Sequence, residues 1–401
     1  MTSKAAKRHG DVRKDLTEAT FARRLVFATL LFFAGTAAFN GFYTKIGFQD
    51  ADRNRGYEAI INRTAARPYI YRQLVPATAN LIDRLAPSSL RERLTRLRSD
   101  NGEGLYETLF SPPITRDSDN SFRYLVFYLM SFAGAPLAAF AFYLVCRTEG
   151  YSSEISLIAG SLVVLVIPYI QIRGGGNYED FLEAAFIALA FVLARRAQWV
   201  WIVPLAFCGT LNKESFIIVL LALWPLLRDR TGALRALLQV FTLEFIAVGL
   251  YVFERMRFER NPGGTVQYHL GDQIAFFSCP SLWLLKFGKV YGIFLPELGT
   301  LGPALLVFWI VREAWGGFSL PIRRYAALTA AMTFPLFFLF CNPAETRDLS
   351  LLYVVLLLSI AATLVRFSSS QAAVVLDPPG PTERTELDLS EAARLESGVP
   401  R

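Results

Sequence analysis

Charged residues and metal ligands are scarce in this sequence. Only 19% of its 401 residues are charged, whereas 53% are hydrophobic and 14% are aromatic, which is too apolar for an ordinary soluble domain. Two histidines and four cysteines leave little material for binding zinc, iron or haem. The composition therefore indicates a membrane protein whose chemistry uses carboxylates, amides and cations.

Several common catalytic signatures are absent as well. The sequence has no GxxxxGK[ST] loop, no HExxH helix and no GxSxG turn, so the usual markers of nucleotide-binding proteins, metalloproteases and serine hydrolases are missing. The net charge of +7 does not indicate nucleic-acid binding, because the basic residues occur singly or in pairs between apolar runs. Such a distribution orients a protein in a bilayer.

Apolar stretches that could be membrane spans follow one another along the chain. There are ten: Leu25 to Tyr43, Phe122 to Cys146, Ile155 to Ile172, Phe181 to Ala194, Trp199 to Leu211, Phe216 to Leu227, Ala236 to Phe253, Val290 to Val311, Tyr325 to Phe340 and Leu349 to Val365. We therefore predict an all-α fold, a polytopic transmembrane helix bundle of about ten spans within residues 25–367. Residues 1–24 form a basic N-terminal segment, and residues 368–401 are expected to be a disordered tail.

Positive charge is distributed unequally between the two sides of this bundle. The short connections of one side contain Arg147, Arg195, Arg196, Arg228, Arg230, Arg235, Arg312, Arg323 and Arg324. Those of the other side contain only Arg173, Lys213 and Arg347. Because cytoplasmic loops carry the excess of lysine and arginine, both termini are predicted to be cytoplasmic.

Two long loops fall on the opposite, outer side. In the first, residues 44–121, the stretches 69–85 and 88–98 alternate apolar residues and arginines at roughly helical spacing. Such stretches are expected to form helices lying along the membrane interface. The second loop, residues 254–289, contains the turn signal Asn261-Pro262-Gly263-Gly264.

The turn Asn212-Lys213-Glu214 separates two apolar segments of about 13 residues, each reaching only about 20 Å across a hydrocarbon core of about 30 Å. It would then lie at membrane depth, where a polar loop must be buried in protein or line a wet cavity. The alternative is a plain interfacial hairpin with a thinned bilayer around it. The polar run from Gly174 to Asp180 precedes another short span on the same side, which favours the cavity.

More polar clusters share the outer side. Asp50 and Asp52 follow the first span and are either a solvated pair, a proton acceptor or oxygen ligands for a hard cation such as Mg²⁺. Tyr71 and Arg72 lie where a helix would meet the interface. Arg72 therefore either anchors that helix or binds a phosphate.

The later part of the chain adds three polar features. Glu345 and Arg347, between the last two spans, form either a local ion pair of little energetic value or part of the outer site. Glu244 falls near the middle of its span, where an isolated charge is costly, so it is expected to be protonated, paired or directed into the bundle. Cys279 and Cys341 both fall on the outer side, as a disulfide or as two free thiols.

These motifs together resemble the bacterial membrane proteins related to the GT-C superfamily of lipid-linked-sugar glycosyltransferases. The resemblance covers most of the chain, from the first span to the tenth. It rests on the short motifs Asp50-x-Asp52, Tyr71-Arg72-x-Leu74-x-Pro76, Tyr178-x-Asp180, Asn212-Lys213-Glu214 and Glu345-x-Arg347. It implies an inner-membrane location, a catalytic base in the first outer loop and a sugar donor carried on polyprenyl phosphate. It departs at Lys213, where relatives more often have arginine, so a bidentate phosphate fork is lost while the charge is kept.

The leading hypothesis is therefore an inner-membrane glycosyltransferase that transfers a sugar from polyprenyl phosphate to an acceptor on the periplasmic face. Asp50 or Asp52 would deprotonate the acceptor, with Mg²⁺ as an optional ion and no other cofactor expected. The substrate-binding residues would be Tyr71, Arg72, Asp180, Asn212, Lys213, Glu214, Glu345 and Arg347, with the cations stabilising the departing phosphate.

Two other classes of protein fit the same residues. In a transporter or flippase for an anionic lipid or solute, the outer charges would bind cargo, and Glu244 and the helix break at Asn212 would suit that role. A non-catalytic envelope-assembly protein would tolerate neutralisation of every outer cluster.

Overall fold

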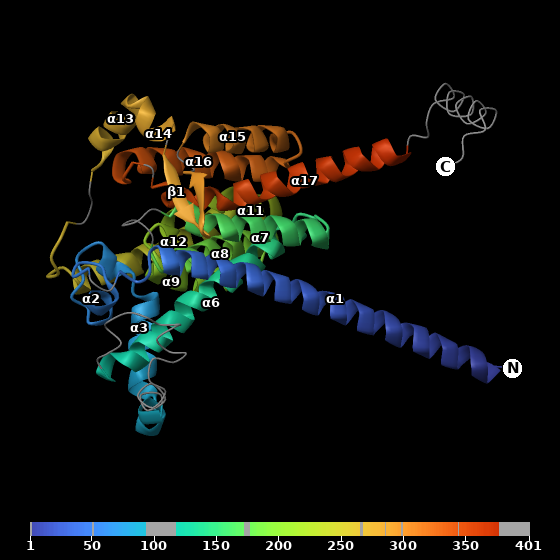
Figure 1. The fold of residues 1–401 in the computed structure, drawn as a ribbon, viewed down its shortest axis with the longest axis horizontal. Helices are drawn as coiled ribbons and strands as arrows, with labels where there is room; N and C mark the ends of the chain where they lie inside the picture. Colours follow the sequence, from blue (N-terminus) through green and yellow to red (C-terminus); the bar gives the residue numbers. More distant parts are fainter. Residues whose placement is uncertain are drawn as a thin grey trace, which may run out of the picture.

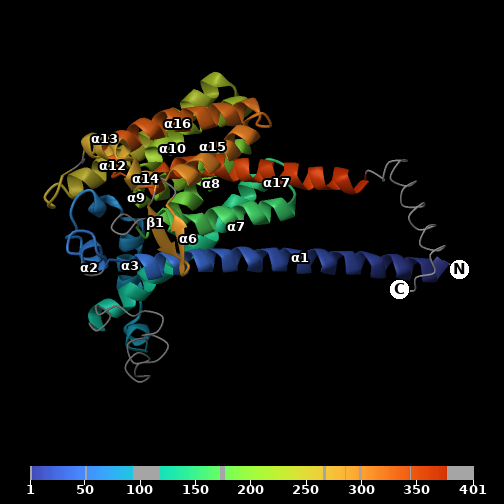
Figure 2. The same ribbon diagram turned by 45° about the horizontal axis from the view of Figure 1, so that its top comes forward.

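The computed structural model is a nearly all-α bundle with one small β-hairpin (Figure 1). It describes residues 2–49, 52–93, 118–171, 177–264, 268–284, 286–297, 300–343 and 345–376. The N-terminal end of α1 and the C-terminal end of α17 project from the same end of the bundle, whereas α2, α3 and α13 lie at the other end (Figures 1 and 2).

Long helices alternate with short ones along the chain. The bundle contains α1 (Thr2–Lys45), α6 (Ser118–Thr148), α7 (Ser153–Ile170), α8 (Asp180–Arg195), α9 (Trp199–Asn212), α10 (Phe216–Ala222), α11 (Trp224–Thr231), α12 (Ala233–Arg257), α15 (Leu301–Trp315), α16 (Leu320–Phe340), η3 (Thr346–Leu352) and α17 (Tyr353–Leu376). Smaller elements at the loop end are α2 (Tyr57–Ile61), η1 (Tyr69–Tyr71), α3 (Leu74–Leu85), α13 (Leu270–Ser278), α14 (Pro280–Leu284), β1 (Phe287–Val290) and β2 (Ile293–Pro296).

Five helical segments within the described residues are long and apolar enough to cross a membrane. They are Phe21–Lys45, Phe122–Thr148, Ser153–Ile170, Ala233–Arg257 and Thr346–Ser368. Large apolar side chains cover their outer faces, as on α12, where Phe241 and Phe245 are exposed. In a membrane protein such a face contacts lipid rather than water.

The helix α8 occupies the centre of the bundle. Nearly all its side chains are buried, and α6 packs along it. Small residues bring the neighbouring helices close together: a Cβ atom at Gly35 of α1 would lie 2.5 Å from the backbone of Pro136 in α6. Close packing of small residues is the usual means of helix association within a bilayer.

Three elements differ from the sequence-based expectation. The stretch Val290 to Val311, expected to be one span, is divided between the β1–β2 hairpin and α15. The stretch Phe216 to Leu227 is divided into α10 and α11, with Pro225 in the first turn of α11 because proline cannot supply the backbone N–H of a continuing helix. The last helix reaches Leu376, inside the expected tail, and residues 377–401 lie outside the described part of the chain.

The two outer loops are joined by hydrogen bonds to backbone carbonyls. The Asn261 side chain donates to the carbonyls of Arg63 and Ala65 at 3.0 and 2.9 Å, and the Arg67 N–H donates to Pro262 at 2.8 Å. Gly263 has φ of +93°, and a Cβ there would lie 2.6 Å from the Arg67 carbonyl oxygen, so only glycine fits. The predicted turn at residues 261–264 thus fixes one outer loop against the other.

Candidate functional site

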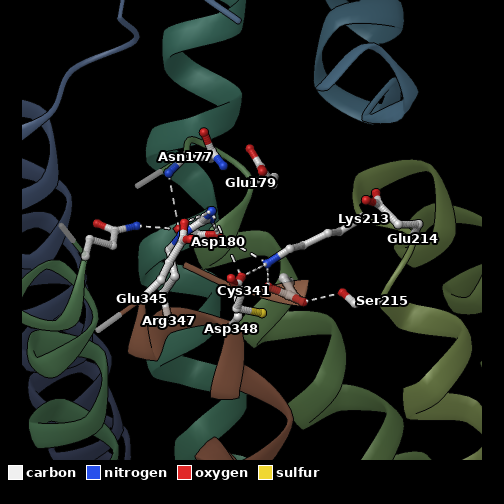
Figure 3. A network of polar contacts seen from close by, with 12 residues as sticks. Asn177, Glu179, Asp180, Lys213, Glu214, Ser215, Cys341, Glu345, Arg347 and Asp348 are labelled. Atoms are coloured by element: carbon white, nitrogen blue, oxygen red, sulfur yellow. Dashed lines mark hydrogen bonds and ion pairs between the residues drawn. The ribbon is translucent and has the colours of Figure 1, made fainter. Parts of the chain in front are cut away.

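Charged side chains converge where three segments meet at the loop end of the bundle. Asp180 begins α8, Lys213 lies between α9 and α10, and Arg347 lies in η3. All three side chains are buried, and Figure 3 shows them directed toward one another. The sequence-based expectation that these distant segments share one site is therefore met for these three residues.

Lys213 is surrounded by carboxylates. Its Nζ lies 2.8 Å from Glu183, 3.6 Å from Asp180 and 3.6 Å from Asp348. Burial alone would lower the pKa of Lys213, but Glu183 and Asp180 raise it above its ordinary value. The surrounding carboxylates therefore favour the charged form of this side chain. Ser215 donates a hydrogen bond of 2.6 Å to the other Glu183 oxygen, which holds that carboxylate in place.

Arg347 pairs with acids on both of its sides. Its Nη2 lies 2.7 Å from Glu345 and its Nη1 lies 3.1 Å from Asp180. Asp180 also accepts a hydrogen bond of 2.7 Å from Gln171, at the end of α7. The Tyr353 hydroxyl donates to the Arg347 carbonyl at 3.4 Å, so this group joins the end of α7 and the start of α8 to η3 and the start of α17.

Arg72 forms a second group with Glu179 and Glu214. It donates a short hydrogen bond to Glu179, and its Nε lies 3.9 Å from Glu214. The Tyr178 hydroxyl donates to the Arg72 carbonyl at 3.0 Å, and the Asn212 amide donates to the Glu179 carbonyl at 3.0 Å. These bonds connect the first outer loop to the start of α8 and the end of α9.

The described ion pairs of this site contain more acids than bases. The cations are Arg72, Lys213 and Arg347, and the acids are Glu179, Asp180, Glu183, Glu214, Glu345 and Asp348. Buried charges are stable only when paired and hydrogen-bonded. Each expected cation therefore already has carboxylate partners, and a bound phosphate would have to compete with them.

A cavity of about 510 Å³ opens beside these charges. Its polar lining residues include Arg72, Lys213, Glu214, Arg347 and Asp348, and its apolar lining residues include Ile217, Ile218, Leu336, Phe337, Phe340 and Leu351. The apolar residues of α16 recur at helical spacing and so present one face. A cavity of this kind suits an amphipathic ligand with a charged head and an apolar chain.

Arg255 is the cation that the sequence did not single out. It lines the same cavity, and its guanidinium lies over the rings of Tyr251 at 4.8 Å and Tyr71 at 5.8 Å. Among the described residues it has no carboxylate within ion-pair distance, and its Nε has no hydrogen-bond partner. Two aromatic faces thus hold a guanidinium ready for an anion.

The other expected residues lie at or near the cavity. Tyr71, Glu345 and the turn residues Lys213 and Glu214 line it, while Asn212 is buried behind the turn. Gly174 to Gly176 are outside the described residues.

Of the two expected catalytic acids, only Asp52 lies in the described part of the chain, and it does not line the cavity. Asp50 lies outside the described part of the chain. Asp52 accepts hydrogen bonds from the Asn54 N–H at 2.8 Å and from Arg55 Nε at 2.7 Å. Burial raises the pKa of Asp52, but these donors and the charge of Arg55 together lower it below its ordinary value.

Sequence reasoning missed Glu179, Glu183, Asp348 and Arg255 as site residues. Asp180 and Glu183 are three apart at the start of an apolar helix, a spacing that places both on one face and that could have identified Glu183. No sequence pattern distinguishes Arg255 in this way. Its spacing from Tyr251 is common on helices, and its exposed neighbour Arg257 is also an arginine.

The remaining polar features take no visible part in the site. Glu244 does not line the cavity. All four cysteines are free thiols, so Cys279 and Cys341 do not form the disulfide considered above. Among the described residues no three acidic, histidine or cysteine side chains are grouped so as to hold a metal ion.

A comparison with protein-family models, curated proteins and solved structures finds no match. The likeness to the GT-C superfamily thus rests on the short motifs alone.

Proposed function

We propose that the protein is a membrane glycosyltransferase that moves a sugar from a polyprenyl-phosphate donor to an acceptor on the outer face. The observation that carries the proposal is the cavity of about 510 Å³, lined by both apolar and charged side chains, with Arg255 among the lining residues. A polyprenyl-phosphate sugar has the matching form, with a long apolar chain, one phosphate and a polar sugar. The expected partners are this lipid and the bilayer itself.

Different cavity residues would have different roles in binding and catalysis. The apolar face of α16 at Phe337 and Phe340 would hold the first isoprenoid units by burial of apolar surface. Arg255 would bind the phosphate and stabilise the charge that develops on it as the sugar leaves. Lys213 and Arg347, which are already paired, would fix the positions of the surrounding carboxylates rather than bind the phosphate directly.

The proposal includes a topology of ten crossings in a bacterial inner membrane, with both termini in the cytoplasm. Support comes from the arginine asymmetry of the short connections and from the single end of the bundle at which α1 begins and α17 finishes (Figure 1). Short helices such as α8 would cross within the bundle, shielded from lipid by their longer neighbours.

The test is a transfer assay with purified protein and polyprenyl-phosphate sugars in liposomes. A transferase releases free polyprenyl phosphate as the sugar reaches a soluble or lipid acceptor. Donors that differ in the sugar, with one polyprenyl chain, would be compared in parallel. Binding of polyprenyl phosphate without any release across all donors would contradict transferase activity.

A transporter for a lipid-linked or small ionic solute is the second candidate. The observation in its favour is the excess of buried carboxylates beside the broken helix pair α9 and α10, because transporters place ionisable groups at such breaks. Proteoliposomes decide between the two: a transporter moves labelled cargo across the bilayer and leaves its covalent structure unchanged.

A further inference from the structure

Four carboxylates among the described residues line the cavity, and two of them are held by short hydrogen bonds while a third lies farther from its cations. Glu183 accepts hydrogen bonds from the Lys213 ammonium at 2.8 Å and from the Ser215 hydroxyl at 2.6 Å. Glu345 accepts hydrogen bonds from two nitrogens of Arg347 at 2.7 and 3.0 Å. The third, Asp348, lies 3.6 Å from Lys213 and 4.0 Å from Arg347. Two cations therefore share these three acids.

Glu214 is the cavity carboxylate with the fewest constraints. Its contact with a cation is the 3.9 Å approach of Oε2 to the Nε of Arg72, which is too long for a hydrogen bond. Within the described residues, both of these atoms are buried and neither has a hydrogen-bond partner. The side chain is 31% exposed, more than Asp348 at 19% or Glu183 at 1%, and it lies apart from the Lys213 cluster (Figure 3).

We infer that Glu214 is the group that takes the proton from the acceptor hydroxyl during sugar transfer. The inference rests on the proposed glycosyltransferase function and names its catalytic base. A general base needs a carboxylate that reaches the substrate and is not occupied by other donors. Glu214 meets both conditions, since it borders the cavity where Arg255 would hold the donor phosphate.

The transfer step balances with this assignment. The acceptor O–H bond breaks and its proton passes to the Glu214 carboxylate, while the acceptor oxygen forms a bond to the anomeric carbon. The bond between that carbon and the phosphate oxygen breaks, and its electron pair leaves with polyprenyl phosphate. The resulting Glu214 carboxylic acid returns its proton to water, so the enzyme is regenerated without an oxidant, a reductant or a further reactant.

Asp52 is less suited to this step. Both its oxygens are engaged, one by the Asn54 N–H and one by Arg55, and it does not line the cavity. These donors stabilise the charged form of Asp52, whose lowered pKa makes it a weaker base at neutral pH.

The experiment compares Glu214→Gln with Asp50→Asn, Asp52→Asn and the control Glu259→Gln in full-length protein. Glu259 is an exposed carboxylate in the outer loop, beyond the cavity. Transfer rate is measured across pH, and binding of polyprenyl phosphate is measured separately by quenching of tryptophan fluorescence. We expect Glu214→Gln to lower kcat by about 100-fold or more, to keep lipid binding within about threefold, and to lose the fall in rate at acid pH that the wild type shows.

The outcomes distinguish failure of the proposed glycosyltransferase function from failure of the assignment of Glu214 as its base. A wild type that binds the lipid but transfers no sugar contradicts the proposed function itself. An active wild type in which Glu214→Gln keeps its rate, or keeps the acid fall with a reduced rate, overturns the assignment of the base alone. Loss of that acid fall in Asp50→Asn or Asp52→Asn instead returns the role to the first outer loop.

Discussion

At the residue scale, Arg255 and its neighbour Arg257 provide a direct comparison. Both lie in the last turn of α12, but Arg255 faces the cavity between two tyrosine rings, whereas Arg257 is exposed and pairs with Glu254 at 3.3 Å. Replacement of Arg255 by alanine should weaken polyprenyl phosphate binding by about 10-fold or more, because a hydrogen bond to a charged group is worth about 1.5–3 kcal/mol. Lipid titration of the purified variants measures the change.

The matched variant is Arg257→Ala, which should bind the lipid within about twofold of the wild type, because Arg257 does not line the cavity. Arg255→Lys should recover only part of the affinity, because an ammonium cannot form the bidentate contact with phosphate. Equal losses in Arg255→Ala and Arg257→Ala would show that positive charge near the surface, and not the cavity residue, attracts the lipid.

Replacement of Lys213 tests whether the buried network of ion pairs stabilises the fold. Its ammonium is 7% exposed and Glu183 is 1% exposed, so Lys213→Met should leave uncompensated buried charge and cost about 3–5 kcal/mol. Adding Glu183→Gln to Lys213→Met should recover part of this loss, because one carboxylate then no longer needs a cation. Thermal unfolding in detergent measures the stability of both single variants and of the double variant. The difference from additivity gives the interaction free energy between Lys213 and Glu183.

The control for that cycle is Arg366, which pairs with Glu313 at 3.2 Å with both side chains largely exposed. Arg366→Met should change stability by no more than about 1 kcal/mol. Additive effects of Lys213→Met and Glu183→Gln would contradict a direct interaction between the two buried groups.

At the element scale, the packing of α1 against α6 depends on Gly35. A Cβ there would lie 2.5 Å from Pro136 Cα and N, and these backbone atoms cannot move as a flexible side chain can. Gly35→Ala should therefore separate the two helices and cost about 1–3 kcal/mol. Gly249→Ala in α12 is the control, because nothing lies within 4 Å of its added Cβ. Melting temperatures of the two variants should differ clearly, and equal values would contradict close packing at Gly35.

Most of the long elements were predictable, because a span needs a long apolar run and such runs are visible in the sequence. The described helices α1, α6 and α12 each contain an expected stretch, and α7 and α17 each contain most of one. The β1–β2 hairpin was not predictable in the same way: Phe287 to Pro296 is as apolar as a helix, and only the turn at Tyr291 and Gly292, both with positive φ, gives it a strand pairing. Short apolar runs are ambiguous in this respect.

At the scale of the whole molecule, the sequence predicted that segments of the proposed outer face would meet at one site. It did not predict which acid would pair with which base. Position along alternating spans indicated that Arg72, Asp180, Lys213 and Arg347 share one side. Which acid pairs with which base depends on helix rotation, and a turn of one residue changes a side chain's direction by about 100°. Glu183 and Arg255 therefore emerged only when the helices were placed in three dimensions.

The topology itself can be tested across one helix. Residue 230 precedes α12 and residue 259 follows it, and the 25 residues between Ala233 and Arg257 form a helix of about 37 Å, enough to cross a bilayer core of about 30 Å. In intact cells with a permeable outer membrane, an impermeant thiol reagent should label Glu259→Cys above the background of the natural cysteines. Arg230→Cys should require lysis for labelling, because we propose that the arginine-rich end faces the cytoplasm. Labelling of both variants without lysis would mean that α12 lies along the membrane instead of crossing it, and the cavity would then have no fixed side from which to receive its substrate.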